Sequence, residues 1–341
     1  MTHPRFVAAA VQAAPAFLDL PGSVAKTVRL IDEAAAHGAQ LIAFPEAWIP
    51  GYPWWIWLDS PAWGMQFVQR YHDNSIVAES REMDEIREAA RRHRMFVVLG
   101  TSEKDHGSLY LGQSLIAADG TVLAHRRKLK PTHVERTVFG DGYGADLAVH
   151  ETALGRLGAL CCWEHLQPLT KYAMYSMHEQ VHVASWPGFS LYTGKAFALG
   201  PELNAAVSQV YAAEGQAYVI AATAVVSEAM QELLCDTPAK RDLLRIGGGR
   251  SMIYAPDGRP LCEFLAPEAE GIVYAELDLG AIALAKAAAD PVGHYSRRDV
   301  TRLLLNRSPA AAVENFAPGF EERSAEPAGD IESDMDGRRR P

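Results

Sequence analysis

Cys162 stands where an apolar run ends and the chain turns polar, next to a second cysteine, Cys161. The run 157–160 predicts a buried strand, and the helical spacing of apolar residues over 166–177 predicts a helix after it. A thiol at such a turn faces unpaired backbone amides, which lower a thiol pKa and can hold an oxyanion. Cys162 is therefore a candidate nucleophile. The alternative is that both cysteines are small buried side chains.

Two charged residues could serve that thiol. Glu46 directly follows the apolar run 41–44 and Pro45, so it is either a solvated turn residue or an acid whose pKa is raised by burial. Lys128 lies in the basic run 125–130, where strand alternation lets one side chain point inward while its neighbours face water; the whole run could also be a solvated face. A thiolate, a carboxylate that takes its proton and an ammonium are the parts needed for covalent attack on an electrophilic carbon.

An unusual loop follows Glu46. Residues 48–58 contain four tryptophans together with two prolines and a glycine. Such a loop is too apolar to lie in water, and its composition argues against a helix, so we expect it to line a pocket or to pack in the core. The candidate pocket residues are Tyr52, Trp54 and, from a later strand, Trp186. Aromatic walls suit an aromatic or arylalkyl ligand, although an aliphatic ligand also binds an apolar wall.

Strands and helices alternate along the chain and must position these residues. The strand–helix–strand order at the start favours parallel pairing in a sheet covered by helices, and hairpins make the sheet mixed. Buried strands are predicted at 6–11, 41–44, 96–100, 157–160, 181–186, 217–223 and 271–277, with hairpins at 109–124 and 251–264. Further helices are predicted at 23–37 (with Ser23 as N-cap), 63–71, 80–93, 203–213 and 282–288.

Composition limits the function. The 341 residues are 48% hydrophobic and 22% charged with a net charge of -10, which argues against a nucleic-acid or anionic-membrane surface. We find no apolar stretch long enough for a membrane span and no signal peptide. The four cysteines have neither disulfide-framework nor zinc-ribbon spacing, and the histidines form no ligand cluster. We therefore expect a cytoplasmic protein without a metal or cofactor.

The last part of the chain differs from the rest. After about Ser308 the sequence consists largely of Ala, Pro, Gly and acidic residues without apolar periodicity. This change predicts one domain over residues 1–308 and a flexible C-terminal tail over residues 309–341.

Three motifs in this order resemble the nitrilase branch of the carbon-nitrogen hydrolase family: residues 44–46, residues 126–136 and residues 162–165. The resemblance covers about residues 6–305. It implies a single α/β domain with mixed sheets, arranged as a four-layer α-β-β-α sandwich.

The resemblance also implies roles for individual residues. Glu46 would be the general base, Lys128 the electrostatic stabiliser, Cys162 the nucleophile and Glu135 a second acid, while Cys161 would have no catalytic role. By the same resemblance, further residues would contact the substrate or support the site: Trp163, Glu164 and His165 at the substrate, and His133 in the surrounding layer.

Within that branch, the sequence is similar to bacterial arylacetonitrilases through residues 50–55 and 290–295. This similarity implies hydrolysis of a nitrile by water to a carboxylic acid and ammonia, through a covalent thioimidate and thioester, with an amide as possible by-product. It also implies homodimers that extend into spirals or filaments, which the apolar region 63–71 and the tail would fit. The alternatives are a cyanide-degrading relative, an amidase and an inactive ligand-binding scaffold.

Overall fold

The structure, a computed structural model, describes residues 3–308 of the chain, which belong to one compact unit. The strands are β1 (Arg5–Ala13), β2 (Ala39–Ala43), β3 (Phe96–Asp105), β4 (Ser108–Ile116), β5 (Val122–Arg127), β6 (Val149–Thr152), β7 (Gly155–Cys161), β8 (Val181–Trp186), β9 (Tyr218–Ala224), β10 (Met252–Tyr254) and β11 (Gly271–Asp278). The α-helices are α1 (Leu20–Ala36), α2 (Pro61–Asn74), α3 (Arg81–His93), α4 (Pro168–Ser176), α5 (Pro201–Gly215), α6 (Glu228–Leu234), α7 (Pro238–Leu243) and α8 (Ala281–Ala288). The predicted tail lies outside the described residues.

The strands pair in the order β5-β4-β3-β2-β1-β9-β8-β7-β6, with β11 beside β1 and β10 beside β9. Parallel pairs, such as β1 with β2, occur together with antiparallel hairpins, such as β3 with β4. Strands β1 and β9 share only two residue pairs, Gln12 with Thr223 and Ala13 with Ala224. The strands therefore form two halves joined at one corner: a first half of β1–β5 with β11, and a second half of β6–β10.

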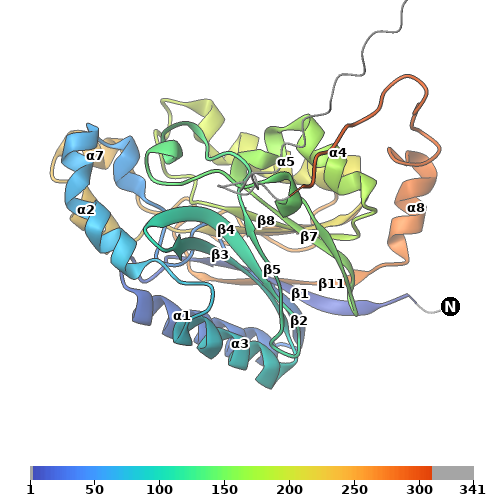
Figure 1. The fold of residues 1–341 in the computed structure, drawn as a ribbon, viewed down its shortest axis with the longest axis horizontal. Helices are drawn as coiled ribbons and strands as arrows, with labels where there is room; N and C mark the ends of the chain where they lie inside the picture. Colours follow the sequence, from blue (N-terminus) through green and yellow to red (C-terminus); the bar gives the residue numbers. More distant parts are fainter. Residues whose placement is uncertain (1–2, 309–341) are drawn as a thin grey trace, which may run out of the picture. The chain divides into compact units, whose positions relative to one another are not determined.

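The two halves face each other and are covered by helices on their outer faces (Figure 1). One core cluster combines residues of the first half, such as Ala8 and Leu41, with residues of the second half, such as Leu157 and Val183. Other clusters pack α1 and α3 on the first half, and α4 and α5 on the second. This is the four-layer α-β-β-α sandwich that the sequence predicts.

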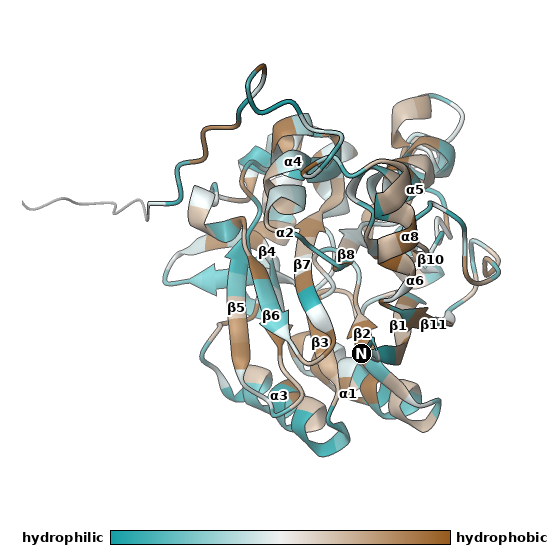
Figure 2. Ribbon diagram, turned by 90° about the vertical axis from the view of Figure 1, so that its right-hand side faces the viewer, coloured by the Kyte–Doolittle hydropathy of each residue, from teal (hydrophilic) through white to brown (hydrophobic). Residues whose placement is uncertain are grey.

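Local sequence explains the outer helices. Apolar residues concentrate in the central strands, and polar ones on α3 (Figure 2). In α3, Met83 and Ile86 are buried, and Ser80 caps the helix by accepting a hydrogen bond from the Met83 amide. The cap of α1 was predicted wrongly: Asp19 caps that helix, whereas Ser23 is buried within it and its hydroxyl bonds the Ala16 carbonyl.

Two other predicted elements differ from the structure. The predicted helix 166–177 is present as α4 but begins at Pro168, because a 3₁₀-helix, Cys162–Leu166, precedes it and Pro168 has no amide to continue that helix. Leu169 is consequently exposed rather than part of the buried face. The second arm of the late hairpin is not a strand, since only an isolated bridge joins Tyr254 to Pro260.

Polar bonds join the two halves close to the ends of β2, β7 and β8. Gln113 of β4 donates from Nε2 to Ser185 Oγ of β8 over 2.8 Å, and Ser185 Oγ donates to the Phe44 carbonyl over 2.9 Å. All three residues are buried. These bonds set the spacing between the segment after β2 and strand β8, which lies beside β7. The candidate site is built from residues at the ends of these strands.

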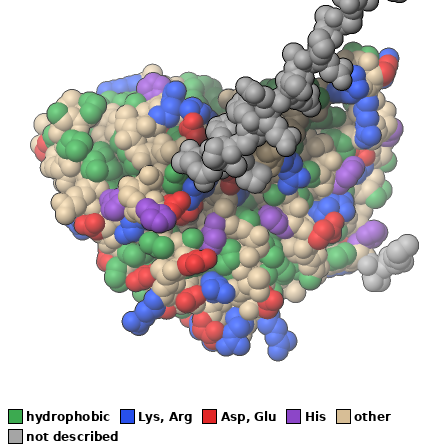
Figure 3. All heavy atoms as spheres, viewed as in Figure 1, with side chains coloured by type: hydrophobic (Ala, Val, Ile, Leu, Met, Phe, Trp, Pro, Cys, Tyr) green, Lys and Arg blue, Asp and Glu red, His purple; other side chains and the backbone are tan. Residues whose placement is uncertain are grey.

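Acidic and basic side chains are interspersed on the visible surface, while hydrophobic side chains gather at its left, over α2 and α7 (Figure 3). None of the helices described here is long and apolar enough to cross a membrane.

Candidate active site

Three charged side chains meet in the interior of the protein. Lys128, directly after β5, donates from Nζ to Glu46 Oε1 over 3.0 Å and to Glu135 Oε2 over 2.8 Å. Glu46 follows β2, and Glu135 lies in the 3₁₀-helix His133–Thr137. Each of these side chains is at most 1% exposed. One ammonium is therefore shared by two carboxylates that come from different parts of the chain.

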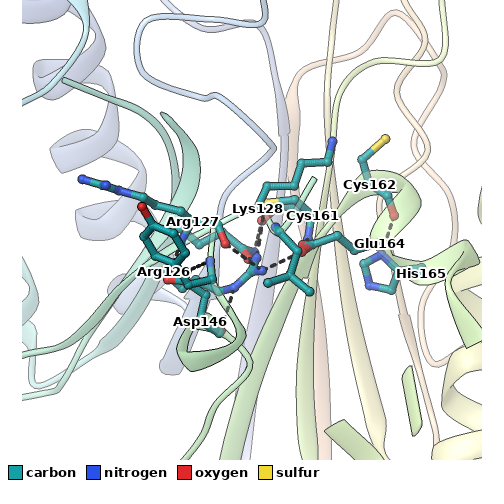
Figure 4. A network of polar contacts seen from close by, with 12 residues as sticks. Arg126, Arg127, Lys128, Asp146, Cys161, Cys162, Glu164 and His165 are labelled. Atoms are coloured by element: carbon teal, nitrogen blue, oxygen red, sulfur yellow. Dashed lines mark hydrogen bonds and ion pairs between the residues drawn. The ribbon is translucent and has the colours of Figure 1, made fainter. Parts of the chain in front are cut away.

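Cys162 lies directly beside this cluster. Its Sγ is within 4.8 Å of a carboxylate oxygen of Glu46 and of one from Glu135. Lys128 and Cys162 extend to the same side, whereas Arg127 points away (Figure 4). Cys162 has φ +46°, a left-handed conformation that is strained for a residue with a Cβ. The sharp turn after β7 thus places the thiol beside Glu46, Lys128 and Glu135, as expected from the sequence.

The two carboxylates are held differently. Glu135 Oε1 accepts a hydrogen bond from Tyr52 OH over 2.8 Å, and its Oε2 also accepts one from the Thr132 amide over 2.6 Å. Tyr52 OH is fixed in turn by Trp57 Nε1. Glu46 Oε2 is buried and has no hydrogen-bond partner among residues 3–308. Both oxygens of Glu135 therefore accept hydrogen bonds, whereas Glu46 has one oxygen without a partner, which can take a proton.

Burial dominates the electrostatics. It raises the pKa of Glu46 to about 8, an effect that Lys128 opposes and Glu135 reinforces. Burial alone would lower the pKa of Lys128, but Glu135 and Glu46 together raise it well above its usual value. Burial, reinforced by Glu46, also raises the pKa of the Cys162 thiol well above its usual value. The expected low thiol pKa is thus wrong for the resting site, and the thiol needs a base.

Glu46, Glu135 and Cys162 are close enough for one ion to contact all three. However, Lys128 Nζ already bonds both carboxylates, and a divalent metal would have to displace this buried ammonium. The two carboxylates are therefore better suited to the Lys128 ammonium that they already bind than to a metal ion. The absence of a metal stays a prediction.

A cavity opens onto Cys162. Its lining includes four residues that the sequence assigns to the substrate: Tyr52, Trp54, Trp163 and Trp186. It also includes residues that were not predicted to line it: Trp57, Thr132, Pro187, Gly188, Phe189, Leu191, Leu199 and Asn204. Most of the second set come from the segment after β8, whose apolar residues have no periodic spacing that would reveal a pocket.

Glu164 and His165 do not line the cavity, so the structure does not bring them to the proposed substrate position, and their contact with the substrate stays a prediction. The 3₁₀ turn after β7 directs both side chains behind the thiol (Figure 4). Glu164 forms an ion pair of 2.8 Å with Arg126, and each side chain is only 4% exposed. The basic run 125–130 is thus not a uniformly solvated face. His133 also lies outside the cavity lining and stacks on Trp57, with ring centroids 5.4 Å apart.

Known proteins are similar in sequence to this chain over most of its length. Residues 7–287 match the carbon-nitrogen hydrolase family. The chain belongs to that family. A protein named nitrilase from Pseudomonas syringae pv. syringae (strain B728a) is 59% identical to this carbon-nitrogen hydrolase, over 89% of this chain and 91% of the relative.

Two further relatives differ in the substrates their names give. An aliphatic nitrilase from Rhodococcus rhodochrous is 54% identical, over 89% of this chain and 83% of the relative. A nitrilase from Alcaligenes faecalis, named arylacetone-specific, is 51% identical over 94% of this chain and 90% of the relative. This carbon-nitrogen hydrolase therefore lies in the nitrilase branch of the family.

Solved structures agree on the fold. The NitFhit protein of C. elegans has a TM-score of 0.66 at 20% identity, over 92% of this chain and 70% of that chain. Nit3 of Saccharomyces cerevisiae, a member of the nitrilase superfamily, also gives a TM-score of 0.66, at 17% identity over 86% of this chain and 96% of that chain. The four-layer arrangement of this carbon-nitrogen hydrolase is thus that of its structural relatives.

Proposed function

We propose that the protein hydrolyses an organic nitrile, preferably an arylacetonitrile, to the carboxylic acid and ammonia, with Cys162 as nucleophile. The observation that carries this proposal is the shared position of three groups. The Cys162 thiol lies at an aromatic cavity, against the carboxylate of Glu46, whose partner is the buried ammonium of Lys128. Relatives named nitrilases at 50–59% identity support the reaction class.

In the first step, Glu46 takes the thiol proton on its free oxygen. The thiolate then adds to the nitrile carbon, so that a carbon–sulfur bond forms and one carbon–nitrogen π bond breaks. Lys128 and the backbone amide of Trp163 stabilise the negative charge that develops on nitrogen. Glu46 then gives the proton that it took from the thiol to this nitrogen, which forms a covalent thioimidate and returns Glu46 to its ionised state.

In the second step, Glu46 accepts a proton from a water that adds to the thioimidate carbon. The tetrahedral intermediate expels ammonia and becomes a thioester, and a second water hydrolyses the thioester to the acid and the free thiol. If the intermediate expels the thiolate instead, the product is an amide. Glu135, held by Tyr52 and Lys128, is placed to assist protonation of the leaving amine.

The preference for an arylacetonitrile is supported by the cavity. The rings of Trp54, Trp57, Trp163, Trp186 and Phe189 line it. Planar walls favour a planar aryl group. The relative named arylacetone-specific agrees with this preference, whereas the relative named aliphatic nitrilase makes an aliphatic nitrile the main competitor.

The test measures ammonia release from phenylacetonitrile, benzonitrile, aliphatic nitriles, cyanide and the matching amides, with intact-mass detection of an adduct. Cys162→Ala should abolish turnover and the adduct. Cys161→Ala is the matched control and should keep most of both, because Cys161 does not line the cavity. Equal loss in the two variants would contradict the assignment of the nucleophile. Turnover confined to cyanide would favour a cyanide hydrolase, and faster turnover of amides an amidase.

We also propose a cytoplasmic homo-oligomer, built from dimers that extend into spirals or filaments. Cys161, Cys162, Cys235 and Cys262 are all free, which suits a reducing compartment. The side chain of Met65 on α2 is 64% exposed, and that of Val68, one turn later, is 39% exposed. An apolar stripe on the outer face of a helix suits contact with a second copy of the chain.

A further inference from the structure

A line of buried polar side chains runs from the Cys162 backbone to α5. His165 Nδ1 lies 2.6 Å from the Cys162 carbonyl oxygen (Figure 4), and His165 Nε2 lies 2.8 Å from His182 Nε2. His182 Nδ1 lies 2.8 Å from Glu179 Oε1, and Tyr211 OH donates to Glu179 Oε2 over 2.6 Å. The four side chains are at most 2% exposed, and none of them lines the cavity.

The order of donors along this line follows from the Cys162 carbonyl, which can only accept. His165 must therefore carry its proton on Nδ1. Burial lowers the pKa of both histidines well below the usual value, so each ring is neutral and carries one N–H. His165 Nε2 is then an acceptor, and His182 must donate to it from Nε2. His182 Nδ1 is in turn an acceptor, and a protonated Glu179 is the donor that faces it.

Other features of the fold support this order. Burial raises the pKa of Glu179 to about 8, which keeps the acid neutral at pH 7. An ionised Glu179 would need a positive charge on His165 or on the adjacent His182, and burial lowers the pKa of both rings. Gly158 of β7 makes room for the acid, because a Cβ at that position would collide with Glu179 Oε1. The His182 ring also stacks on Tyr211, with centroids 3.9 Å apart.

We propose that Glu179 is a neutral carboxylic acid in the resting enzyme, and that Glu179, His182 and His165 are positioning residues for Cys162. His165 fixes the direction of the Cys162 carbonyl and so holds the left-handed turn that aims the thiol at the cluster. A peptide group that accepts a hydrogen bond becomes a better donor. The amide N–H of Trp163 belongs to that same peptide group and bonds the thiol, so it should stabilise the thiolate more strongly. This inference rests on the proposed role of Cys162.

The first test compares two substitutions of Glu179 by kcat and KM for phenylacetonitrile. Glu179→Gln keeps an N–H for His182 Nδ1 and an oxygen for Tyr211, so kcat should stay within about twofold. Glu179→Leu removes both bonds, so kcat should fall on the order of ten- to a hundredfold while KM changes little. Equal losses of kcat in the two variants would overturn the proposal, because an ionised Glu179 would lose its partner in both.

The second test is infrared spectroscopy of enzyme carrying ¹³C-labelled glutamate, which detects the carbonyl band of a protonated carboxylic acid. Glu179→Gln should remove one such band. The control Glu214→Gln should remove none, since Glu214 on α5 is 46% exposed and paired with Lys171. If Glu179→Gln leaves these carbonyl bands unchanged, Glu179 is not protonated in the resting enzyme and the proposal is overturned. The Glu179 band should persist in Cys162→Ala. Turnover by that variant would contradict the assignment of Cys162 as nucleophile but would leave the infrared result for Glu179 unchanged.

Discussion

Residues around Cys162 act as one electrostatic unit rather than as independent groups. Lys128 holds one oxygen of Glu46 and one of Glu135, so the pKa of Glu46 depends on both neighbours. Because burial raises the pKa of Glu46 to about 8, this base is mostly protonated at pH 7 in the resting site. The thiol also keeps its proton. In the proposed mechanism, ionisation of Glu46 is therefore the event that prepares the site for attack.

This coupling predicts the pH dependence of activity. The proposed base must be ionised, so kcat/KM should rise with pH, with an apparent pKa of about 8 that belongs to the cluster. The measurement is a pH profile of kcat/KM for phenylacetonitrile between about pH 6 and pH 9. A profile that is flat or falls over this range would contradict the role of Glu46.

The stability of the Glu46→Gln variant is an independent check of the same pKa. The folded-state pKa of Glu46 lies above the reference value of 4.5, so its contribution to stability is present below about pH 4.5 and is lost as pH rises through about 8. Wild type should therefore lose stability relative to Glu46→Gln over this range. Parallel curves of unfolding free energy against pH would show that the pKa of Glu46 is not raised.

The sequence was sufficient for some residues and not for others. Glu46 and Cys162 could be predicted because each stands directly after an apolar run, where side chains of different strands converge. Glu179 and His182 were missed, because their contacts depend on how β8 lies against α5, which no local spacing encodes. A signal existed nonetheless: His182 is the one charged or titratable residue inside the apolar strand 181–186.

At the scale of elements, close backbone approach places Glu46. A Cβ on Gly100 of β3 would collide with the Pro45 carbonyl oxygen and would lie 3.0 Å from the Glu46 Cα. The Glu46 amide also donates to the Trp186 carbonyl over 3.1 Å. The turn after β2 is thus fixed between β3 of its own half and β8 of the other half.

This packing predicts that Gly100→Ala both destabilises the protein and impairs the site. The added methyl must displace backbone, so the unfolding free energy should fall by about 1–3 kcal/mol or more, and kcat should fall because the carboxylate of Glu46 moves. Thermal unfolding and kcat provide the measurements. Gly107→Ala, in the β3–β4 turn, is the matched control, since a Cβ there meets nothing within 4 Å. Equal effects in both variants would contradict the argument.

Strand pairing was easier to predict than the segments between strands. The strand 181–186 was predicted with its observed bounds, because buried parallel strands are short apolar runs. The start of the helix after Cys162 was predicted two residues too early, because its apolar spacing includes Leu166, whereas α4 begins at Pro168. The distinction matters for function, since the short 3₁₀ turn directs Glu164 and His165 behind the thiol.

At the scale of the molecule, the sandwich explains why the chemistry needs the whole chain. Glu46 and Lys128 belong to the first half and Cys162 to the second, so the cluster exists only when the halves pack face to face. The shared core and the bond from Gln113 to Ser185 maintain that packing. Alternating strands and helices predicted a sheet covered by helices, and the four-layer sandwich followed from the family resemblance. The distance between the two halves could not be predicted from the sequence, because it depends on side-chain packing.

The outer surface yields the last prediction, which concerns assembly. Hydrophobic side chains gather over α2 and α7, and Leu233 on α6 is 43% exposed. If this surface joins copies of the chain, Met65→Glu should place a charge in the contact and lower the mass measured by light scattering. Leu284→Glu on α8, where the side chain is 79% exposed, is the matched control and should leave the mass unchanged. A lower mass only for Leu284→Glu would move the contact to α8, and an unchanged mass for Met65→Glu would exclude α2 as the contact.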